Sequence, residues 1–215
     1  MAKRGSAGLD LENSLWRDGY RRVAGVDEVG RGCLAGPVCA AAVVFDPSAM
    51  VSGLRDSKLL SPKARERFYN EIIASSDWSV SEVSAKEIDR INIQRASLLA
   101  MRKAIMALEI PPDYVIVDGF RVSDLPFPQR AIIGGDRKCA SIAAASIVAK
   151  VTRDRLMRRL HQIDERYGFD RHKGYATTMH LDALEAFGYS ELHRRSFRPT
   201  RLFDEARRDE RPRKS

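Results

Sequence analysis

Apolar residues along the chain gather in short continuous runs and in longer segments with helical spacing. Short apolar runs bounded by glycine, proline or aspartate predict buried β-strands. Five such runs lie at residues 22–27, 36–45, 77–85, 113–119 and 130–136. Segments with apolar residues on one helical face predict α-helices. Four of these lie at residues 61–76, 91–110, 139–168 and 177–188. The interleaving of the two patterns predicts an α/β fold with a five-stranded sheet.

The connections between the predicted strands indicate their relative directions. Only residues 28–35 separate the first two strands, and this span is rich in glycine. Because a parallel connection needs a dozen or more residues, these two strands should pair antiparallel. The strand at 113–119 follows a long helix, and this order predicts a parallel crossover. The sheet should therefore be mixed, with helices accumulating toward the C-terminal end.

The pattern also divides the chain into four segments. Residues 1–20 are polar and should be loosely ordered, apart from a possible helical turn within "LENSLWRDGY". Residues 21–168 should form the main domain and residues 169–203 a helical C-terminal extension. Residues 204–215 form a charged tail that is predicted to be disordered.

Composition narrows the class of protein. The chain has 215 residues, of which 44% are hydrophobic and 31% are charged, as in a soluble globular protein. No apolar stretch reaches the roughly 18–20 residues needed to cross a bilayer, and the N-terminus lacks the apolar core of a secretory signal. Cys33, Cys39 and Cys139 are odd in number and lack the CxxC spacing of a metal or redox site. They are predicted to be reduced thiols of a cytoplasmic protein.

The net charge of +8 is concentrated in the last third of the chain. From Lys150 onward, 17 Lys and Arg residues face 11 Asp and Glu residues. A basic region of this kind favours a polyanionic partner, and nucleic acid is the commonest one. A solvated arginine-rich surface would have the same composition, so this alternative stays open.

Acidic residues end three of the predicted strands. These residues are Asp27, which Glu28 follows directly, Asp118 and Asp136. If two of the strands are parallel neighbours, Asp27 and Asp118 emerge side by side, and like charges repel there by several kcal/mol at intermediate dielectric. A bound cation or raised pKa values would relieve this repulsion. Oxygen ligands without cysteine or histidine favour Mg²⁺ or Mn²⁺. The alternative is that each aspartate caps a turn, which is the commonest role of a single one.

The stretch "VAGVDEVGRG" places a flexible backbone beside two carboxylates. In a regular strand Asp27 and Glu28 would point to opposite faces. Both can face one site only if the strand bulges or breaks, and Gly30 permits such a turn. The glycine spacing also mimics a phosphate-binding loop. However, Arg31 replaces the lysine and a strand follows instead of a helix, which argues against a nucleotide site.

Eight segments, in order over roughly residues 22–199, resemble the ribonuclease HII family. They are "GVDEVGRGCLAGPV", "RDSKLLSPKARE", "INIQRAS", "DYVIVDG", "GGD", "SIAAASIVAKVTRD", "HKGYATTMH" and "HRRSF". The resemblance implies a ribonuclease H-like catalytic domain, with the mixed sheet flanked by helices. It also implies an endonuclease that cuts the RNA strand of RNA/DNA hybrids and incises 5′ of ribonucleotides embedded in duplex DNA. The products would carry 5′-phosphate and 3′-hydroxyl ends.

The resemblance also implies roles for individual residues. The family's four catalytic acids, which hold two divalent ions, fall on Asp27, Glu28, Asp118 and Asp136. Main-chain groups that contact the ribonucleotide 2′-hydroxyl fall on Gly30, Arg31 and Gly32, and the tyrosine that stacks on the following deoxyribose falls on Tyr175. Positions linked to phosphate contact or support of the site fall on Lys58, Ser146 and Lys150.

The implied partners are RNA/DNA hybrids and ribonucleotide-containing duplex DNA, with no membrane. The enzyme should act as a cytoplasmic monomer in ribonucleotide excision repair. Departures from the usual family pattern occur at Cys33, Phe120, Gly134 and Ala143, and none of them removes an expected metal ligand.

Two other functions fit part of the pattern. Another two-metal enzyme on the same sheet, such as a junction resolvase or integrase, would cut an all-DNA duplex equally well. A non-catalytic nucleic-acid-binding module would use the acids only to cap turns and would show no metal site.

Overall fold

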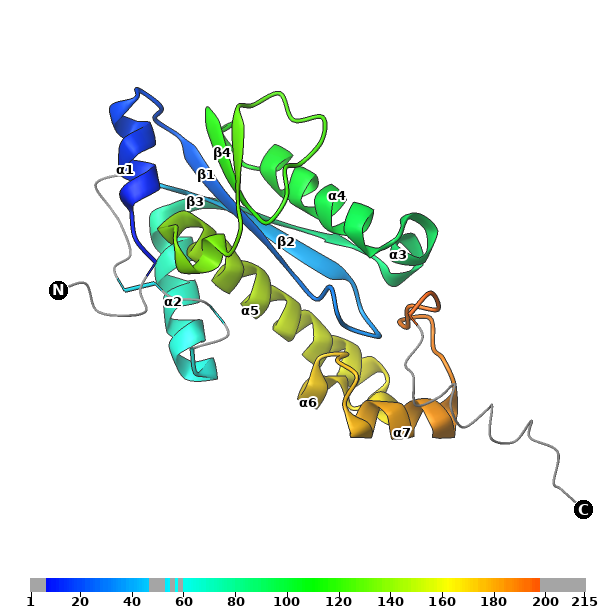
Figure 1. Cartoon of the computed structure of the whole chain (residues 1–215). Helices are drawn as coiled ribbons and strands as arrows, with labels where there is room; N and C mark the ends of the chain where they lie inside the picture. The colour runs from blue at the N-terminus through cyan, green and yellow to red at the C-terminus, as the bar shows by residue number, and fades with distance from the viewer. Residues whose placement is uncertain (1–6, 47–52, 55–56, 58–59, 198–215) are drawn as a thin grey trace, which may run out of the picture.

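A five-stranded mixed sheet forms the centre of the protein (Figure 1), whose computed structural model describes residues 7–46, 53–54, 57 and 60–197. The strand order is β3-β2-β1-β4-β5. The strands are β1 (Val23–Val29), β2 (Val38–Phe45), β3 (Ser76–Val83), β4 (Tyr114–Asp118) and β5 (Gln129–Ile132). β2 pairs antiparallel with both β1 and β3, whereas β4 pairs parallel with both β1 and β5. The predicted hairpin, parallel crossover and mixed sheet are thus confirmed.

Helices cover both faces of this sheet and continue beyond it at one end. They are α1 (Asp10–Arg17), α2 (Pro62–Ser75), α3 (Ala85–Ile91), α4 (Ile93–Met106), α5 (Ala140–Ile163), α6 (Phe169–His172) and α7 (Thr178–Phe187), with short 3₁₀ helices η2 (Gly135–Arg137) and η3 (Glu165–Tyr167). In Figure 1, α4 lies against one face of the sheet, and α5 lies against the other with α2 beside it. Each described helix is too short or too polar to span a membrane.

Four predicted elements differ from the structure. The predicted helix at 91–110 is α4, which spans only Ile93–Met106, and the preceding helix α3 was not predicted. Asn92 separates the two helices, with a φ of 67° and a side chain that caps the start of α4 by accepting from the Arg95 N–H. The predicted strand at 130–136 ends at Ile132, so Asp136 lies in η2 rather than at a strand end. The predicted helix at 139–168 stops at Ile163, before η3 and α6. The possible turn near the N-terminus is the eight-residue helix α1.

Small side chains allow the helices to approach the sheet closely. Alternate residues of β2 face opposite layers, with Ala40 and Ala42 toward α4 and Ala41 and Val43 toward α5. Gly25 in β1 lies directly under α5, where a Cβ atom would come within 2.2 Å of the Ser141 carbonyl carbon. The position of α5 over β1 therefore requires glycine at this point of the strand.

The C-terminal extension packs on the far end of α5 and on the loop that follows β1. Buried apolar residues from the loop, α5, η3, α6 and α7 form a single cluster: Leu34, Ala35, Met157, Tyr167, Phe169, Ala183 and Leu184. Gly188 ends α7 in a positive-φ conformation, which glycine adopts without strain. The predicted tail at 204–215 and the end of the predicted extension lie outside the described residues.

The close contact at Gly25 leads to a prediction about stability. Gly25→Ala should lower the free energy of unfolding by about 1–3 kcal/mol, because the added methyl group overlaps the backbone of α5. Urea unfolding followed by circular dichroism measures the change. The matched control is Gly32→Ala, whose Cβ meets no atom within 4 Å and should change stability by less than about 0.5 kcal/mol. Equal stability of the two variants would contradict the packing argument.

Candidate functional site

Two of the predicted acids lie side by side at one edge of the sheet. β1 and β4 run parallel with Val26 opposite Val117, so Asp27 and Asp118 are the next residues of adjacent strands. Asp27 is buried, with 6% of its surface exposed. Glu28 is half-buried and continues β1, which stays in regular register with β2 as far as Val29, so the predicted bulge or break at this point is wrong. The parallel pairing thus brings together two acids that are 91 residues apart in the sequence.

Burial and mutual repulsion shift the titration of these carboxyl groups. The pKa of Asp27 is raised well above its usual value, first by burial and then by the negative charges of Glu28 and Asp118. A hydrogen bond from the Ser146 hydroxyl and one from the Glu28 N–H oppose this rise. Burial also raises the pKa of Glu28, against the effect of neighbouring Arg31. The site therefore concentrates negative charge at an energetic cost to the free protein.

A main-chain hydrogen bond ties the segment that carries Asp136 to Asp118. The Gly135 N–H donates to Asp118 Oδ1 at 2.7 Å, and this bond holds η2 against the end of β4. Asp136, the next residue, is buried with 6% of its surface exposed. A Cβ on Gly135 would lie 2.5 Å from the Ile142 side chain, so glycine allows η2 to approach this closely.

The carboxylates of the site are paired with donors from the chain itself. Arg31 Nη1 donates to Glu28 Oε1 at 3.1 Å, and its Nη2 donates to Gln94 Oε1 at 2.6 Å. Within the described ranges, no three His, Cys, Asp or Glu side chains are arranged so as to hold a metal ion. The acids supply the carboxylate oxygens that Mg²⁺ and Mn²⁺ prefer. In this structure Asp27 and Asp118 accept hydrogen bonds from main-chain N–H groups, and Glu28 accepts one from the Arg31 guanidinium.

The glycine-rich loop after β1 contains two glycines with different structural demands. Gly30 has a φ of 91°, and a Cβ there would lie 2.2 Å from Arg153 Nε. Gly32 is exposed, has no unusual φ and would accept a Cβ with no atom within 4 Å. Between them, the carbonyl of Arg31 accepts a hydrogen bond from Arg194 Nη1 at 2.8 Å. The fold therefore explains glycine at position 30 but not at position 32.

Tyr175 reaches this loop from the C-terminal extension. It lies between α6 and α7 and forms an isolated antiparallel bridge with Cys33. Its side chain is 40% exposed, and Lys150 Nζ lies 5.8 Å from the ring centroid. Burial, followed by the adjacent Cys33, raises the pKa of the Tyr175 hydroxyl. The structure thus brings Tyr175 and the glycine-rich loop together.

The supporting residues lie on α5. The Ser146 hydroxyl lies 3.0 Å from the Ser57 hydroxyl and near Asp27. Lys150 Nζ donates to Asp154 Oδ1 at 2.7 Å, so its ammonium group is directed along the helix. Lys58 lies outside the described residues.

Sequence reasoning missed two arginines that shape the site. Arg153 and Arg194 have no exposed surface, although arginine is seldom fully buried. Both are bound to main-chain carbonyls of residues 31–37 and so fix the glycine-rich loop. Arg194 belongs to the segment "HRRSF", but a sequence signal for burial was absent because its neighbours are polar.

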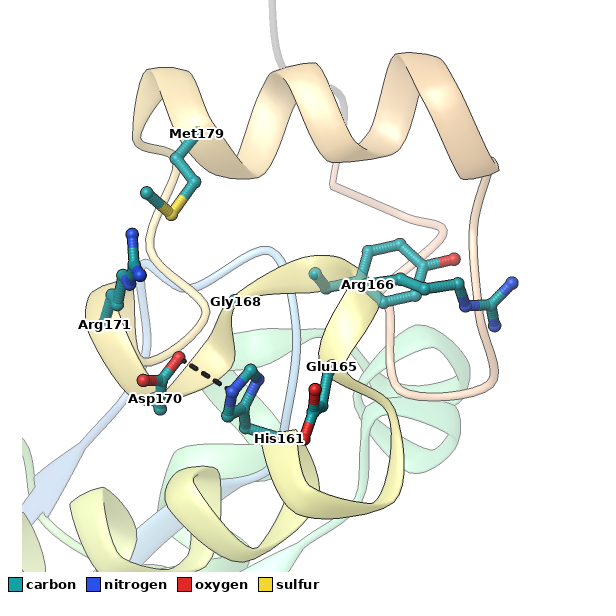
Figure 2. A pocket seen from close by; sticks show the side chains of 8 residues that line it. His161, Glu165, Arg166, Gly168, Asp170, Arg171 and Met179 are labelled. Atoms are coloured by element: carbon teal, nitrogen blue, oxygen red, sulfur yellow. Dashed lines mark ion pairs between the residues drawn. The ribbon is translucent and has the colours of Figure 1, made fainter.

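A separate pocket of about 220 Å³ lies between the end of α5 and the start of α7 (Figure 2). His161 Nε2 and Asp170 Oδ1 lie 3.3 Å apart in the lining of this pocket, and Met179 projects from α7. None of the predicted site residues lines this pocket.

Comparison with known proteins identifies the family. The model of the family described as "Ribonuclease HII" matches residues 24–200. The chain is 51% identical over 190 residues to ribonuclease HII of Caldicellulosiruptor saccharolyticus, covering 88% of this chain and 93% of that protein. It is 54% identical over 181 residues to the Thiobacillus denitrificans enzyme, covering 84% and 89%.

The chain belongs to the ribonuclease HII family. Solved structures agree with this assignment. Ribonuclease H2 from Pyrococcus horikoshii superposes with a TM-score of 0.70 at 28% identity, over 87% of this chain and 99% of that one. Ribonuclease HII of Archaeoglobus fulgidus, in a structure of its complex with PCNA, gives 0.71 at 27% identity, over 83% and 96%.

Membership of the ribonuclease HII family makes the chain a nuclease, a hydrolase with ribonuclease H endonuclease activity on RNA/DNA substrates. Dependence on divalent metal is general to this family. The family assignment therefore decides against a non-catalytic binding module, and also against a resolvase or integrase.

The raised pKa of Asp27 predicts how stability varies with pH in metal-free protein. A carboxyl group whose pKa is higher in the folded state stabilises the fold below its unfolded pKa, and this contribution is lost as pH rises through the folded pKa. At pH 7, Asp27→Asn should therefore raise the melting temperature by about 2 °C or more. The gain should shrink as the pH is lowered toward 4. Calorimetry in the presence of EDTA measures both effects, and a lower melting temperature at pH 7 would contradict the argument.

Proposed function

We propose that this member of the ribonuclease HII family cleaves the RNA strand of RNA/DNA hybrids and incises 5′ of single ribonucleotides in duplex DNA, leaving 5′-phosphate and 3′-hydroxyl ends. The observation that carries the proposal is the juxtaposition at the end of β1. Buried Asp27 adjoins Glu28 and Asp118, and the exposed, sterically unhindered Gly32 follows four residues after Glu28.

The proposed metal ligands are Asp27, Glu28, Asp118 and Asp136. Their donor set fits Mg²⁺ or Mn²⁺, because all four offer carboxylate oxygens. Burial and mutual repulsion raise the pKa of Asp27 and Glu28, and a divalent cation would relieve both effects. Two such ions, when bound, would lower the pKa of an attacking water and neutralise charge on the phosphate and the leaving oxygen. A ribonuclease HIII with the same fold was solved in complex with Mn²⁺.

The chain's own residues prepare these ligands. The Ser146 hydroxyl stabilises the ionised form of Asp27. The Gly135 N–H orients Asp118, and Arg31 orients Glu28. Each donor supports a charged carboxylate in a partly dehydrated position, where an unpaired charge would be costly.

The glycine-rich loop is proposed to recognise the ribose of the ribonucleotide. The 2′-hydroxyl distinguishes RNA from DNA, and main-chain groups of Gly30, Arg31 and Gly32 would contact it. No atom of the described residues lies within 4 Å of a Cβ at Gly32, so close approach of substrate would account for the absence of a side chain there. Arg194 holds the Arg31 carbonyl, which fixes the loop before substrate arrives.

Tyr175 is proposed to recognise the junction between the ribonucleotide and the DNA that follows it. Its partly exposed ring lies beside the glycine-rich loop, where it would stack on the next deoxyribose. Lys150 and Lys58 are proposed to contact substrate phosphates. Asp154, four residues further along α5, accepts a hydrogen bond from the ammonium group of Lys150.

The further proposals concern assembly and cellular role. The chain is proposed to act as a monomer in ribonucleotide excision repair. A solved relative from Archaeoglobus fulgidus forms a complex with PCNA, so a protein partner is compatible with this fold. Light scattering of the purified chain measures its mass, and a stable dimer would contradict the monomer.

Removal of one proposed ligand should abolish catalysis. Asp118→Asn should lower the rate of incision at a single embedded ribonucleotide by about 100-fold or more, because a charge at the reacting phosphate is lost. Binding of the same duplex should change little, and the heat of Mn²⁺ binding should fall. The control is Asp124→Asn, which alters an exposed carboxylate between β4 and β5 and should have neither effect. Wild-type incision by Asp118→Asn would overturn the metal-site proposal.

Substitution of Gly32 tests recognition of the ribose without a change in the stability of the fold. Gly32→Ala should keep its stability but lower the rate of ribonucleotide incision by about tenfold, since the methyl group blocks close approach. Gly30→Ala is the contrasting variant, because the overlap with Arg153 and the φ of 91° should reduce its stability. Melting temperatures and single-turnover rates separate the two effects. Unchanged incision by Gly32→Ala would remove this residue from ribose recognition.

A further inference from the structure

Three buried histidines occupy the centre of the C-terminal extension. They are His172 in α6, His180 in α7 and His193 in the loop after α7, and each is less than 9% exposed. The rings of His172 and His180 stack with centroids 4.4 Å apart. The Nε2 atoms of His180 and His193 lie 3.0 Å apart.

The hydrogen bonds determine which nitrogen of each ring carries the proton. His193 Nδ1 accepts from the Ser190 N–H at 3.0 Å, so the neutral ring carries its proton on Nε2. That proton is donated to His180 Nε2, so His180 carries its own proton on Nδ1. His180 Nδ1 then donates to the main-chain carbonyl of Tyr175 at 2.9 Å. A directional chain thus runs from Ser190 through two imidazoles to Tyr175.

The third histidine is also fully engaged. His172 Nδ1 accepts from the Gly174 N–H at 3.1 Å, and its Nε2 is bonded to the Tyr167 carbonyl at 2.6 Å. Every ring nitrogen of the three histidines therefore has a protein partner. No metal-binding set of three occurs here or elsewhere in the described residues. Burial lowers the pKa of His180 and His193 to about 4, which keeps both rings neutral at pH 7.

These bonds converge on the main chain of Tyr175. Its carbonyl accepts from His180 and also from the Thr177 N–H at 2.8 Å, while its own N–H donates to the His172 carbonyl at 3.0 Å. The preceding residue, Gly174, accepts from the Leu34 N–H at 2.8 Å and so ties the segment to the glycine-rich loop. These bonds fix the main chain from which the exposed ring of Tyr175 projects.

We propose that His180, oriented by His193, is a positioning residue that sets Tyr175 for reading the junction between ribonucleotide and DNA. The inference rests on the proposed role of Tyr175 and adds two residues to that role. A group that is ordered before substrate binds avoids the loss of affinity that ordering it afterwards would cost. The imidazole pair contributes to this order by holding the main-chain carbonyl of Tyr175.

Matched substitutions at His180 test the inference. His180→Phe keeps an aromatic ring but loses the donor to Tyr175, whereas His180→Asn keeps an N–H near the position of Nδ1. The readout is the ratio of incision at a single embedded ribonucleotide to incision within a continuous hybrid. The ratio should fall about fivefold in His180→Phe, as for one lost hydrogen bond, and return close to wild type in His180→Asn. An unchanged ratio in His180→Phe, or an equal fall in both variants, would overturn the inference.

A double-mutant cycle separates positioning from general damage to the fold. Tyr175→Ala should itself lower the ratio, and adding His180→Phe should lower it no further, because the residue to be positioned is gone. A further fall would show that His180 acts by another route. If Tyr175→Ala leaves the ratio unchanged, the junction-reading role of Tyr175 fails and the positioning role fails with it, whereas the metal-site proposal stands.

Nitrogen chemical shifts of the wild-type chain test the hydrogen-bonded chain without any substitution. At pH 7, ¹⁵N NMR should report a proton on Nε2 of His193 and on Nδ1 of His180. This measurement keeps the inference falsifiable if His180→Phe does not fold. A proton on Nε2 of His180, or a charged ring on either residue, would overturn the proposed chain.

Discussion

The buried guanidinium of Arg153 joins the three parts of the molecule that meet at the site. It donates to the carbonyls of Pro37 and Ala35 in the loop after β1, and to the carbonyl of Lys173 in the C-terminal extension. Because α5 carries this arginine and lies directly on β1, the sheet, the loop and the extension are held at fixed positions. Loss of such a buried charge partner leaves main-chain carbonyls without donors, which is costly away from water.

A second constraint acts against the fold at the acids. Asp27, Glu28 and Asp118 are held close enough for their charges to raise the pKa values of the first two. The parallel pairing of β1 with β4 enforces this arrangement, and apolar burial of both strands offsets its cost. The site is thus strained electrostatically, while its surroundings are well packed.

Local patterns predicted most of the fold. The short span between the first two strands forced a hairpin, and the helix before β4 indicated a parallel crossover, which together place Asp27 beside Asp118. The short helix α3 was missed because its seven residues give too brief an apolar pattern to indicate a helix, whereas the longer α4 was predicted. Asp136 was assigned to a strand end because its apolar run continued to Ile133, whereas the strand pairing stops at Ile132.

The sequence was less informative about what supports the site. Buried arginines and histidines have no periodic signal, since their burial depends on carbonyls supplied by distant segments. Arg194 donates to residues about 160 positions away, and no local pattern encodes such a contact. The steric freedom at Gly32 was equally hidden, because a glycine required by the fold and one required by a ligand read alike in a sequence.

The length of α5 has a mechanical consequence. Its 24 residues span about 36 Å, from the sheet to the extension, and Ser146, Lys150 and Arg153 occupy two adjacent turns near its middle. A tilt of about 3° at one end of such a rod would displace the other by about 2 Å. The same helix carries Ser146, whose hydroxyl is bonded to Asp27, and Arg153, which donates to the carbonyl of Lys173 in the C-terminal extension. The acidic end of the sheet and the extension are therefore coupled through one rigid helix.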